Sequence, residues 1–380
     1  MNTHPSYVYP TVRGYTGISV RFAERNRMLA KATVTVDLAK ITENASRVVE
    51  ALGGRAVVGV TKVTCASPEV ARAMLAGGVA GLADSRLENL ASLRASGIEA
   101  PLWLLRSPVP ALAEDAVRFA DISLESEIDT VVALDAAAAR LGKKHSIVVM
   151  VDLGDLREGI MPAELPAFLE RASALANIDI LGIGLSLTCY GAIVPDAENL
   201  GELVALTHAA ETQLGHRLLV SGGMSSSLDA LIEGTLPDRV DSLRIGESIL
   251  LGVSTVTRER ILGLHTDAIV VEAPVIECLV KPSLPTGTSA QDAFGGFPVF
   301  ENRGIRRRAI CAIGRQDVDP DGLVPVDSRV EVLGASSDHL VLDVDAMSPP
   351  PRIGDGIAFV PSYSATLRLF TSPYVEKLYR

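Results

Sequence analysis

Short apolar segments and amphipathic segments alternate along most of the first two thirds of the chain, and this alternation constrains the fold most strongly. Runs such as AVVGV, PLWLL, SIVVMVDL and RLLVSGG are predicted strands. A segment with apolar residues at helical spacing follows each of them. About eight such units run from AVVGV to SLRIG. Strands separated by helices pair in parallel through right-handed crossovers, so the pattern predicts a (β/α)8 TIM barrel.

An open doubly wound sheet of the Rossmann type is the alternative to the barrel. Such a sheet also alternates strands and helices, but it usually carries a GxGxxG motif after its first strand. The segment after AVVGV reads TKVTCASPE and has no such motif. The barrel is therefore the preferred prediction.

A second domain is predicted after residue 264, where the helical spacing stops. Segments such as AIVVEAPVIECLV, RRRAICAIG and HLVLDV are strand-like and are separated by Pro, Gly and Asp. We expect an N-terminal arm at 1–31, the barrel domain at 32–264 and a C-terminal all-β domain at 265–380. The first strand, at 32–37, is expected to join the β domain. The segment 283–304 is expected to be a loop.

Composition excludes several classes of protein. The 380 residues carry a formal net charge of −11, which repels nucleic acid and anionic membranes, and the arginines at 303, 306, 307 and 308 form too short a basic run to change this. The 4 cysteines show no CxxC spacing, so neither a structural zinc site nor another metal is predicted. No signal-peptide core or membrane span is visible. We expect a cytoplasmic protein.

The end of the first barrel strand carries a lysine. Catalytic groups of a barrel lie at the carboxyl ends of its strands, and Lys62 directly follows VVGVT. Desolvation lowers the pKa of an amine and favours Schiff base chemistry. The alternative is a lysine that extends to the rim and forms an ion pair there.

The ends of the last two barrel strands resemble a phosphate site. The segment VSGGMSSSL brings glycines and Ser225 to the start of a helix, where free N–H groups bind anions. Serine is also a common plain N-cap. The segment SLRIGE adds Arg244 and Gly246 at the place where barrels usually bind phosphate. A lysine, a phosphate cradle and a buried arginine together predict pyridoxal 5'-phosphate as the cofactor.

The fifth barrel strand ends in VDLGDLREGI, where Arg157 lies among acidic residues. A guanidinium at a strand end is suited to bidentate binding of a substrate carboxylate. The alternative is a salt bridge to Asp152, Asp155 or Glu158 within the same segment.

These segments, in this order, resemble the alanine racemase superfamily of fold type III pyridoxal phosphate enzymes. The resemblance begins at TVTVDLAKITENASRV and covers essentially the whole chain after residue 31. The segments around Lys62 and MVDLGDLREGI are similar to the ornithine racemase-like branch. The lysine and RIGE segments are fairly specific for the fold and cofactor, and much less specific for the substrate.

The resemblance implies roles for individual residues in the barrel. Lys62 would carry the cofactor as a Schiff base and act as one proton-transfer base. Arg244 would face the pyridine nitrogen and keep it unprotonated. The phosphate would be bound by Ser225, by the backbone N–H groups of Gly246 and Glu247, and by Tyr363 in PSYSATL.

The resemblance also implies a substrate site shared between two subunits. Arg157 matches the arginine near the substrate carboxylate. Asp338, with its neighbour Ser337 in GASSDHL, matches the segment that the partner subunit contributes beside the substrate. The family forms head-to-tail homodimers, so we expect a homodimer whose active sites contain residues of both chains.

Three positions depart from the family pattern. The tyrosine that acts as the second base is replaced by Arg315 in AIGRQDV, and arginine does not accept a proton at neutral pH. The tyrosine four positions after the lysine is Ala66. The histidine near the ring is missing from LSLTCYG. The candidates for the second base are Asp317, Tyr190, Cys189 and His339.

The predicted function is racemisation or epimerisation at Cα of a small or basic amino acid, of the alanine or ornithine type. In this scheme the substrate amine replaces Lys62 on the cofactor, and a proton is removed from one face and returned to the other. One alternative is a related enzyme of the same fold with another Cα reaction, such as decarboxylation. The other is a non-catalytic protein that binds pyridoxal phosphate.

Overall fold

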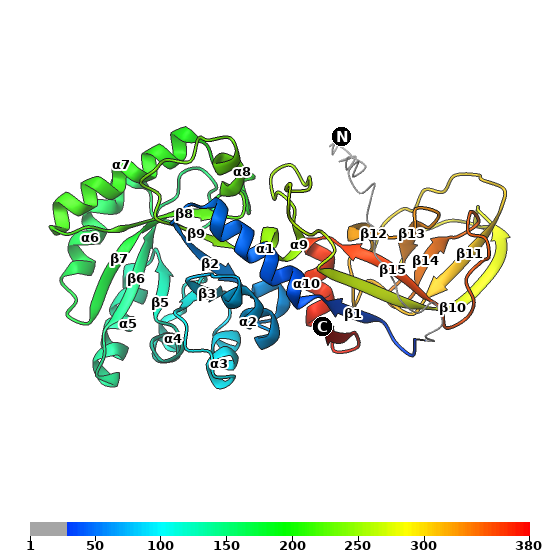
Figure 1. Ribbon diagram of the computed structural model, residues 1–380, viewed down its shortest axis with the longest axis horizontal. Helices are drawn as coiled ribbons and strands as arrows, with labels where there is room; N and C mark the ends of the chain where they lie inside the picture. The colour runs from blue at the N-terminus through cyan, green and yellow to red at the C-terminus, as the bar shows by residue number, and fades with distance from the viewer. Residues whose placement is uncertain (1–28) are drawn as a thin grey trace.

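The computed structural model describes residues 29–380 and shows a closed barrel beside a separate β sheet (Figure 1). Most of the predicted N-terminal arm, residues 1–28, lies outside the described residues. The predicted fold class is confirmed, because the closed barrel contains eight strands and is followed by a mainly antiparallel sheet. The domain boundaries remain predictions.

The barrel strands run parallel, and the last pairs with the first to close the ring. Apolar side chains fill the interior, with Trp103 and Met150 among the largest of them. The strands are β2 (Ala56–Val60), β3 (Gly81–Asp84), β4 (Leu102–Leu104), β5 (Ile122–Glu125), β6 (His145–Met150), β7 (Ile178–Gly184), β8 (Leu219–Met224) and β9 (Ser242–Ile245).

Helices follow the strands and cover the outside of the barrel (Figure 1). Local capping explains several of their ends: Ser67 accepts from the backbone N–H of Val70, and Asp196 forms a capping box with Asn199. The helices are α1 (Leu38–Ala51), α2 (Pro68–Ala76), α3 (Leu87–Ala95), α4 (Ala113–Phe119), α5 (Ile128–Leu141), α6 (Leu165–Ser173), α7 (Ala197–Leu214), α8 (Ser227–Ile232) and α9 (Glu247–Leu251).

The second sheet has the order β12-β15-β10-β11-β14-β13, and β1 adds to β10 from the amino-terminal end of the chain. The strand β1 also pairs in parallel with the last strand, β16. The strands are β1 (Thr33–Val36), β10 (Ile269–Pro282), β11 (Ile305–Cys311), β12 (Leu323–Pro325), β13 (Glu331–Ala335), β14 (Leu340–Asp343), β15 (Gly356–Pro361) and β16 (Glu376–Tyr379).

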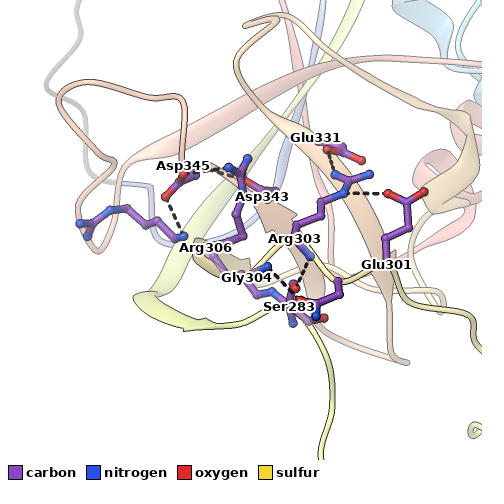
Figure 2. Close-up of polar contacts among 11 residues, drawn as sticks. Ser283, Glu301, Arg303, Gly304, Arg306, Glu331, Asp343 and Asp345 are labelled. Carbon is purple, nitrogen blue, oxygen red and sulfur yellow. Dashed lines mark hydrogen bonds and ion pairs between the residues drawn. The ribbon is translucent and has the colours of Figure 1, made fainter.

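Ion pairs stabilise the outer end of this sheet (Figure 2). Arg306 on β11 pairs with Asp343 at 2.9 Å and with Asp345 at 3.0 Å. Arg303 pairs with Glu331 at 2.6 Å and with Glu301 at 3.0 Å. These two arginines of the short basic run therefore bind carboxylates of the same domain.

The prediction of an all-β second domain missed one helix, α10 (Tyr363–Thr371). Ser362 caps it by accepting from the Ala365 N–H at 3.4 Å, and its buried face includes Leu369 and Phe370. The helix packs against the short 3-10 turn η1 (Lys62–Thr64) of the barrel. It therefore brings the second domain to the end of β2.

No helix among residues 29–380 is long and apolar enough to cross a membrane.

The buried carboxyl group of Glu125 predicts a pH-dependent stability. Glu125 is fully buried at the end of β5, and its Oε1 has no hydrogen-bond partner among the described residues. Burial raises the pKa of Glu125 to about 7. The folded protein therefore keeps a proton that the unfolded chain releases, so this stability is present below pH 4.5 and is lost as the pH rises through about 7.

The variant Glu125→Gln stays neutral at every pH. The difference in unfolding free energy between the variant and the parent protein should therefore shift in favour of the variant by up to about 3 kcal/mol from pH 5 to pH 8. Urea unfolding at both pH values measures this gain, and Glu170→Gln at an exposed position of α6 is the control. An equal difference from the parent protein at both pH values would contradict the assignment.

Candidate active site

The predicted lysine begins a strained turn at the mouth of the barrel. Lys62 is half-buried, and its Nζ lies 5.9 Å from the centroid of the Tyr363 ring on α10. Thr61 anchors the turn by donating to Asp84 on the adjacent strand at 2.9 Å. Cys65 adopts a φ of 49°, a left-handed conformation that is rare outside glycine. The turn thus orients the lysine amine toward the tyrosine of the second domain.

Arg244 lies on β9, directly beside β2, and is almost completely buried. Its guanidinium donates to the carbonyl of Leu185 at 2.6 Å and also to the hydroxyl of Ser221. Burial lowers the pKa of Arg244 to about 10, so the group remains a cation at neutral pH. The side chain ties the ends of three neighbouring strands together.

A cradle of hydroxyl and amide groups follows β8 and β9. The hydroxyl of Ser225 accepts from the backbone N–H of Gly246 at 3.3 Å and from that of Ser248 at 3.5 Å. Ser226 is buried, and its Oγ has no partner within the described part of the chain. A buried hydroxyl without a partner is uncommon and points to an absent hydrogen-bonding group.

Close backbone approach keeps the cradle compact. Gly223 has a φ of 102°, and a Cβ there would lie 2.6 Å from the Ser227 Oγ. A Cβ on Gly246 would lie 2.9 Å from the carbonyl oxygen of Val60. Both positions therefore require glycine. The serine hydroxyls and the first amides of α8 and α9 form a donor set that fits a phosphate.

The carboxyl group of Glu247, at the start of α9, pairs with Arg258 at 2.6 Å. Burial raises the pKa of Glu247 above its ordinary value. The side chain is thus engaged by Arg258, which leaves its backbone N–H as the group suited to a phosphate.

Two aspartates organise the segment after β6. Asp152 accepts from the backbone N–H groups of Gly154 at 2.9 Å and Leu156 at 3.1 Å. Asp155 is buried and accepts from those of Tyr190 and Gly191, both at 3.0 Å. These contacts tie the segment after β6 to the segment after β7.

Arg157 lies on the segment that the aspartates fix. Its Nε and Nη2 bind both carboxylate oxygens of Glu158, a side-on bidentate pair. Burial lowers the pKa of Arg157, but the Glu158 carboxylate outweighs this effect and the net pKa is raised. Of the alternatives left open by the sequence, the structure shows the salt bridge to Glu158.

The candidates after β7 lie on the outer rim. Cys189 contacts the Sδ of Met224 through its Sγ at 3.1 Å. The side chain of Tyr190 is 76% exposed, so in the single chain it is not enclosed by other residues.

The remaining candidates lie in the second domain. Asp317 is buried and accepts from the hydroxyl of Ser372 at 2.6 Å. Asp338 is exposed, lies beside Ser337 and binds His339 at 2.8 Å, which holds the pKa of Asp338 below its ordinary value. The guanidinium of Arg315 lies 5.2 Å from the centroid of the Phe294 ring, and its backbone N–H donates to the Ser336 carbonyl at 2.9 Å.

The loop that carries Arg315 and the loop that carries Ser337 and Asp338 are adjacent. The backbone N–H of Gln316 donates to the Ser337 carbonyl at 3.0 Å, and Gly314 packs on the backbone of Asp338. Arg315, Ser337 and Asp338 therefore lie at one edge of the β domain. The structure does not bring them to Lys62 by any described contact within the same chain.

Within residues 29–380, no group of three or more His, Cys, Asp or Glu side chains is arranged to hold a metal ion.

Comparison with known proteins identifies the family. Residues 36–254 match the family described as alanine racemase, N-terminal domain. The match covers more than half of the chain, so the protein belongs to this family, as the sequence resemblance predicted. It is an amino acid racemase, and thus an isomerase.

Two relatives match nearly the whole chain. Ornithine racemase of Acetoanaerobium sticklandii is 43% identical over 348 residues, which cover 90% of this chain and 98% of the relative. Lysine racemase of Thermotoga maritima is 39% identical over 348 residues, which cover 90% and 97%.

Solved structures confirm the fold. Alanine racemase from a D-cycloserine-producing Streptomyces lavendulae aligns with a TM-score of 0.72 at 19% identity and covers 92% of this chain and 97% of its own. Alanine racemase from Bartonella henselae with covalently bound pyridoxal phosphate aligns with a TM-score of 0.69 at 18% identity, with coverages of 93% and 100%.

Sequence reasoning missed two features of this site. It noted the serine triplet but assigned only Ser225 to the phosphate, whereas Ser226 has the buried hydroxyl without a partner. It considered Glu158 only as a partner that could neutralise Arg157. The triplet itself was the available signal for Ser226, because three hydroxyls exceed the need of a single helix cap.

Proposed function

We propose that the protein racemises a basic amino acid, ornithine or lysine, with pyridoxal 5'-phosphate as its cofactor. The cofactor is supported by three features together: the half-buried Lys62 at the end of β2, the buried Arg244 on the adjacent strand β9, and the unpartnered hydroxyl of Ser226. The two long relatives, named ornithine racemase and lysine racemase, support the substrate class.

The residues present fit the cofactor. Lys62 would hold its aldehyde carbon, and Arg244 would face the pyridine nitrogen as a cation. Ser225, Ser226 and the backbone N–H groups of Gly246 and Glu247 would bind the phosphate. Tyr363 would contact it from α10. When bound, this cofactor acidifies the Cα–H bond of an attached amino acid.

Lys62 would accept or return the Cα proton on one face. Its amine sits on a turn fixed by buried contacts, which gives the precise placement that proton transfer requires. The guanidinium of Arg157 would bind the substrate carboxylate and orient the Cα–H bond toward the amine. The fully buried Arg244 would exclude water from the inner wall of the site.

The second base would be Asp317 or Tyr190, acting on the opposite face. Tyr190 stands on the segment fixed by Asp155, at the mouth of the barrel. Asp317 lies near Lys377, which also lies near Cys65 of the lysine turn. Both roles are proposals that rest on the sequence.

A homodimer would complete the site. Exposed apolar side chains lie at the mouth of the barrel, among them Leu156 and Tyr190, and on the β domain, among them Phe297 and Val299. We propose that the β domain of a second copy covers the mouth and supplies its own Ser337 and Asp338 segment to the substrate. The protein would act in the cytoplasm, in keeping with its free cysteines.

The substitution Ser226→Ala tests the phosphate cradle. Its hydroxyl makes no hydrogen bond within the described residues, so its loss should leave the thermal stability of the cofactor-free protein unchanged. The affinity for pyridoxal phosphate should fall about tenfold, because a hydrogen bond to a charged group is lost. Equilibrium titration of the stripped protein measures this affinity, and Ser173→Ala at an exposed position on α6 is the control. An unchanged affinity would remove Ser226 from the cradle.

A panel of L-amino acids followed by chiral chromatography tests the reaction. We expect D-ornithine or D-lysine to form faster than D-alanine. Release of carbon dioxide with formation of a diamine would instead indicate a decarboxylase. Unchanged substrates in the presence of bound cofactor would indicate a binding protein without activity.

A further inference from the structure

Glu158 is an acid at the mouth of the barrel that no role described so far uses. Its side chain is 35% exposed, and its carboxylate binds both Nε and Nη2 of Arg157. Two guanidinium nitrogens bind two carboxylate oxygens, which is also the geometry in which an arginine binds the carboxylate of a substrate. In the free protein, Glu158 thus occupies the Arg157 guanidinium, which is the group that would bind the substrate carboxylate.

The other acids of this segment are committed to the backbone. Asp152 accepts from two amides of its own loop, and Asp155 accepts from two amides of the segment after β7. Glu158 pairs with a flexible side chain instead. Among the acids from 152 to 158, it is therefore the one whose carboxylate can change partners without unfolding a loop.

The pair also lies close to the inner wall of the site. Burial has the largest effect on the pKa of Arg244 and lowers it. The nearby charge of Glu158 raises this pKa, and that of Arg157 lowers it further. A substrate bound beside Arg244 would therefore lie within reach of both charges.

We propose that Glu158 receives the distal ammonium of the basic substrate and that, before binding, it serves as an internal stand-in for the substrate carboxylate on Arg157. This inference rests on the proposed function and names the residue that selects the substrate. Ornithine and lysine carry one carboxylate and one distal ammonium, so they replace the internal pair by two new pairs.

A neutral amino acid can form only one of these two new ion pairs. Its carboxylate would take Arg157 and would leave the half-buried Glu158 carboxylate without a cation. An unpaired charge in a partly desolvated site is unfavourable, so the pair discriminates against neutral substrates as well as binding basic ones. The internal pair itself is half-exposed, and such pairs are readily broken.

The test compares ornithine with norvaline, which has the same carbon chain but no distal amine. In Glu158→Gln we expect kcat/KM for ornithine to fall about tenfold or more, while that for norvaline stays the same or rises. Glu158→Asp should keep the preference for basic substrates. Glu164→Gln, at a nearby exposed position, should leave both values unchanged.

Binding of 5-aminopentanoate gives a readout without turnover. This molecule has the carboxylate and distal ammonium of ornithine but lacks the α-amine. Calorimetry on the cofactor-loaded protein should show tighter binding of 5-aminopentanoate than of pentanoate. In Glu158→Gln the ratio of the two affinities should fall about tenfold.

Equal losses for ornithine and norvaline would overturn the inference, because they would mean that Glu158 only positions Arg157. Equal binding of 5-aminopentanoate and pentanoate to the parent protein would overturn it as well. If the parent protein turned over no basic amino acid but still preferred 5-aminopentanoate, the proposed reaction would fail and the role of Glu158 would stand.

Discussion

Replacing Lys62 with alanine should lower racemisation by at least about a thousandfold, because the residue would both hold the cofactor and move the Cα proton. The variant should also lose the visible absorbance band of a lysine-bound cofactor. Lys62 is half-buried on a turn whose own contacts involve Thr61 and Asp84, so the fold should survive. Chiral chromatography and an absorbance spectrum of the same sample measure both effects.

Lys143→Ala is the matched control, because this lysine is exposed and precedes β6, whereas the mouth segment follows β6 at the other end of the strand. The Lys143→Ala variant should keep the racemisation rate and the absorbance spectrum of the parent protein. If Lys62→Ala kept the absorbance band and racemised ornithine or lysine at the parent rate, the central lysine of this account would be the wrong one.

The second large effect is expected at Arg244. Replacement with alanine leaves the Leu185 carbonyl without its side-chain donor, removes one of the two donors to the Ser221 hydroxyl, and opens a cavity between β7, β8 and β9. Leaving a buried neutral acceptor without its donor costs about 1–3 kcal/mol. Racemisation should fall together with stability, since the same side chain would face the cofactor.

Urea unfolding at pH 7 and a turnover assay at low temperature separate the two consequences. Arg217→Ala, whose side chain is 73% exposed, should change neither. Arg244→Lys keeps a cation but not the planar fork, so it should recover part of the stability and little of the activity. An Arg244→Ala protein with parent stability and parent turnover would contradict both roles.

The barrel was predictable because its signal is local and repeated. Each strand and helix shows its own period, and a closed parallel barrel is the standard arrangement for about eight such units. The helix α10 is as long as α2 and α3, and it was missed because it directly follows a strand within a region of strand-like segments. The parallel pairing of β1 with β16 joins the two ends of the described chain, and no local pattern encodes a contact of that range.

The positions of the candidate site residues were predictable where they depend on the backbone alone. The rule that barrels carry their chemistry at strand ends selected Lys62, Arg244 and Ser225 as candidates, and their roles stay predictions. Features set by individual side chains were not predictable in this way. The unpartnered hydroxyl of Ser226 and the bidentate pair of Glu158 depend on rotamers and neighbours from other strands. For the same reason the second base stays open, because Arg315 stands where the sequence resemblance leads us to expect a tyrosine.

The most direct test of the account is proton exchange at Cα. L-ornithine and L-lysine are incubated with the cofactor-loaded protein in D2O, and proton NMR and chiral chromatography follow the same samples. Deuterium should enter Cα and the D-enantiomer should accumulate for at least one of the two amino acids, and Lys62→Ala should abolish both signals. Full retention of the Cα proton in both amino acids by a protein with bound pyridoxal phosphate would contradict it.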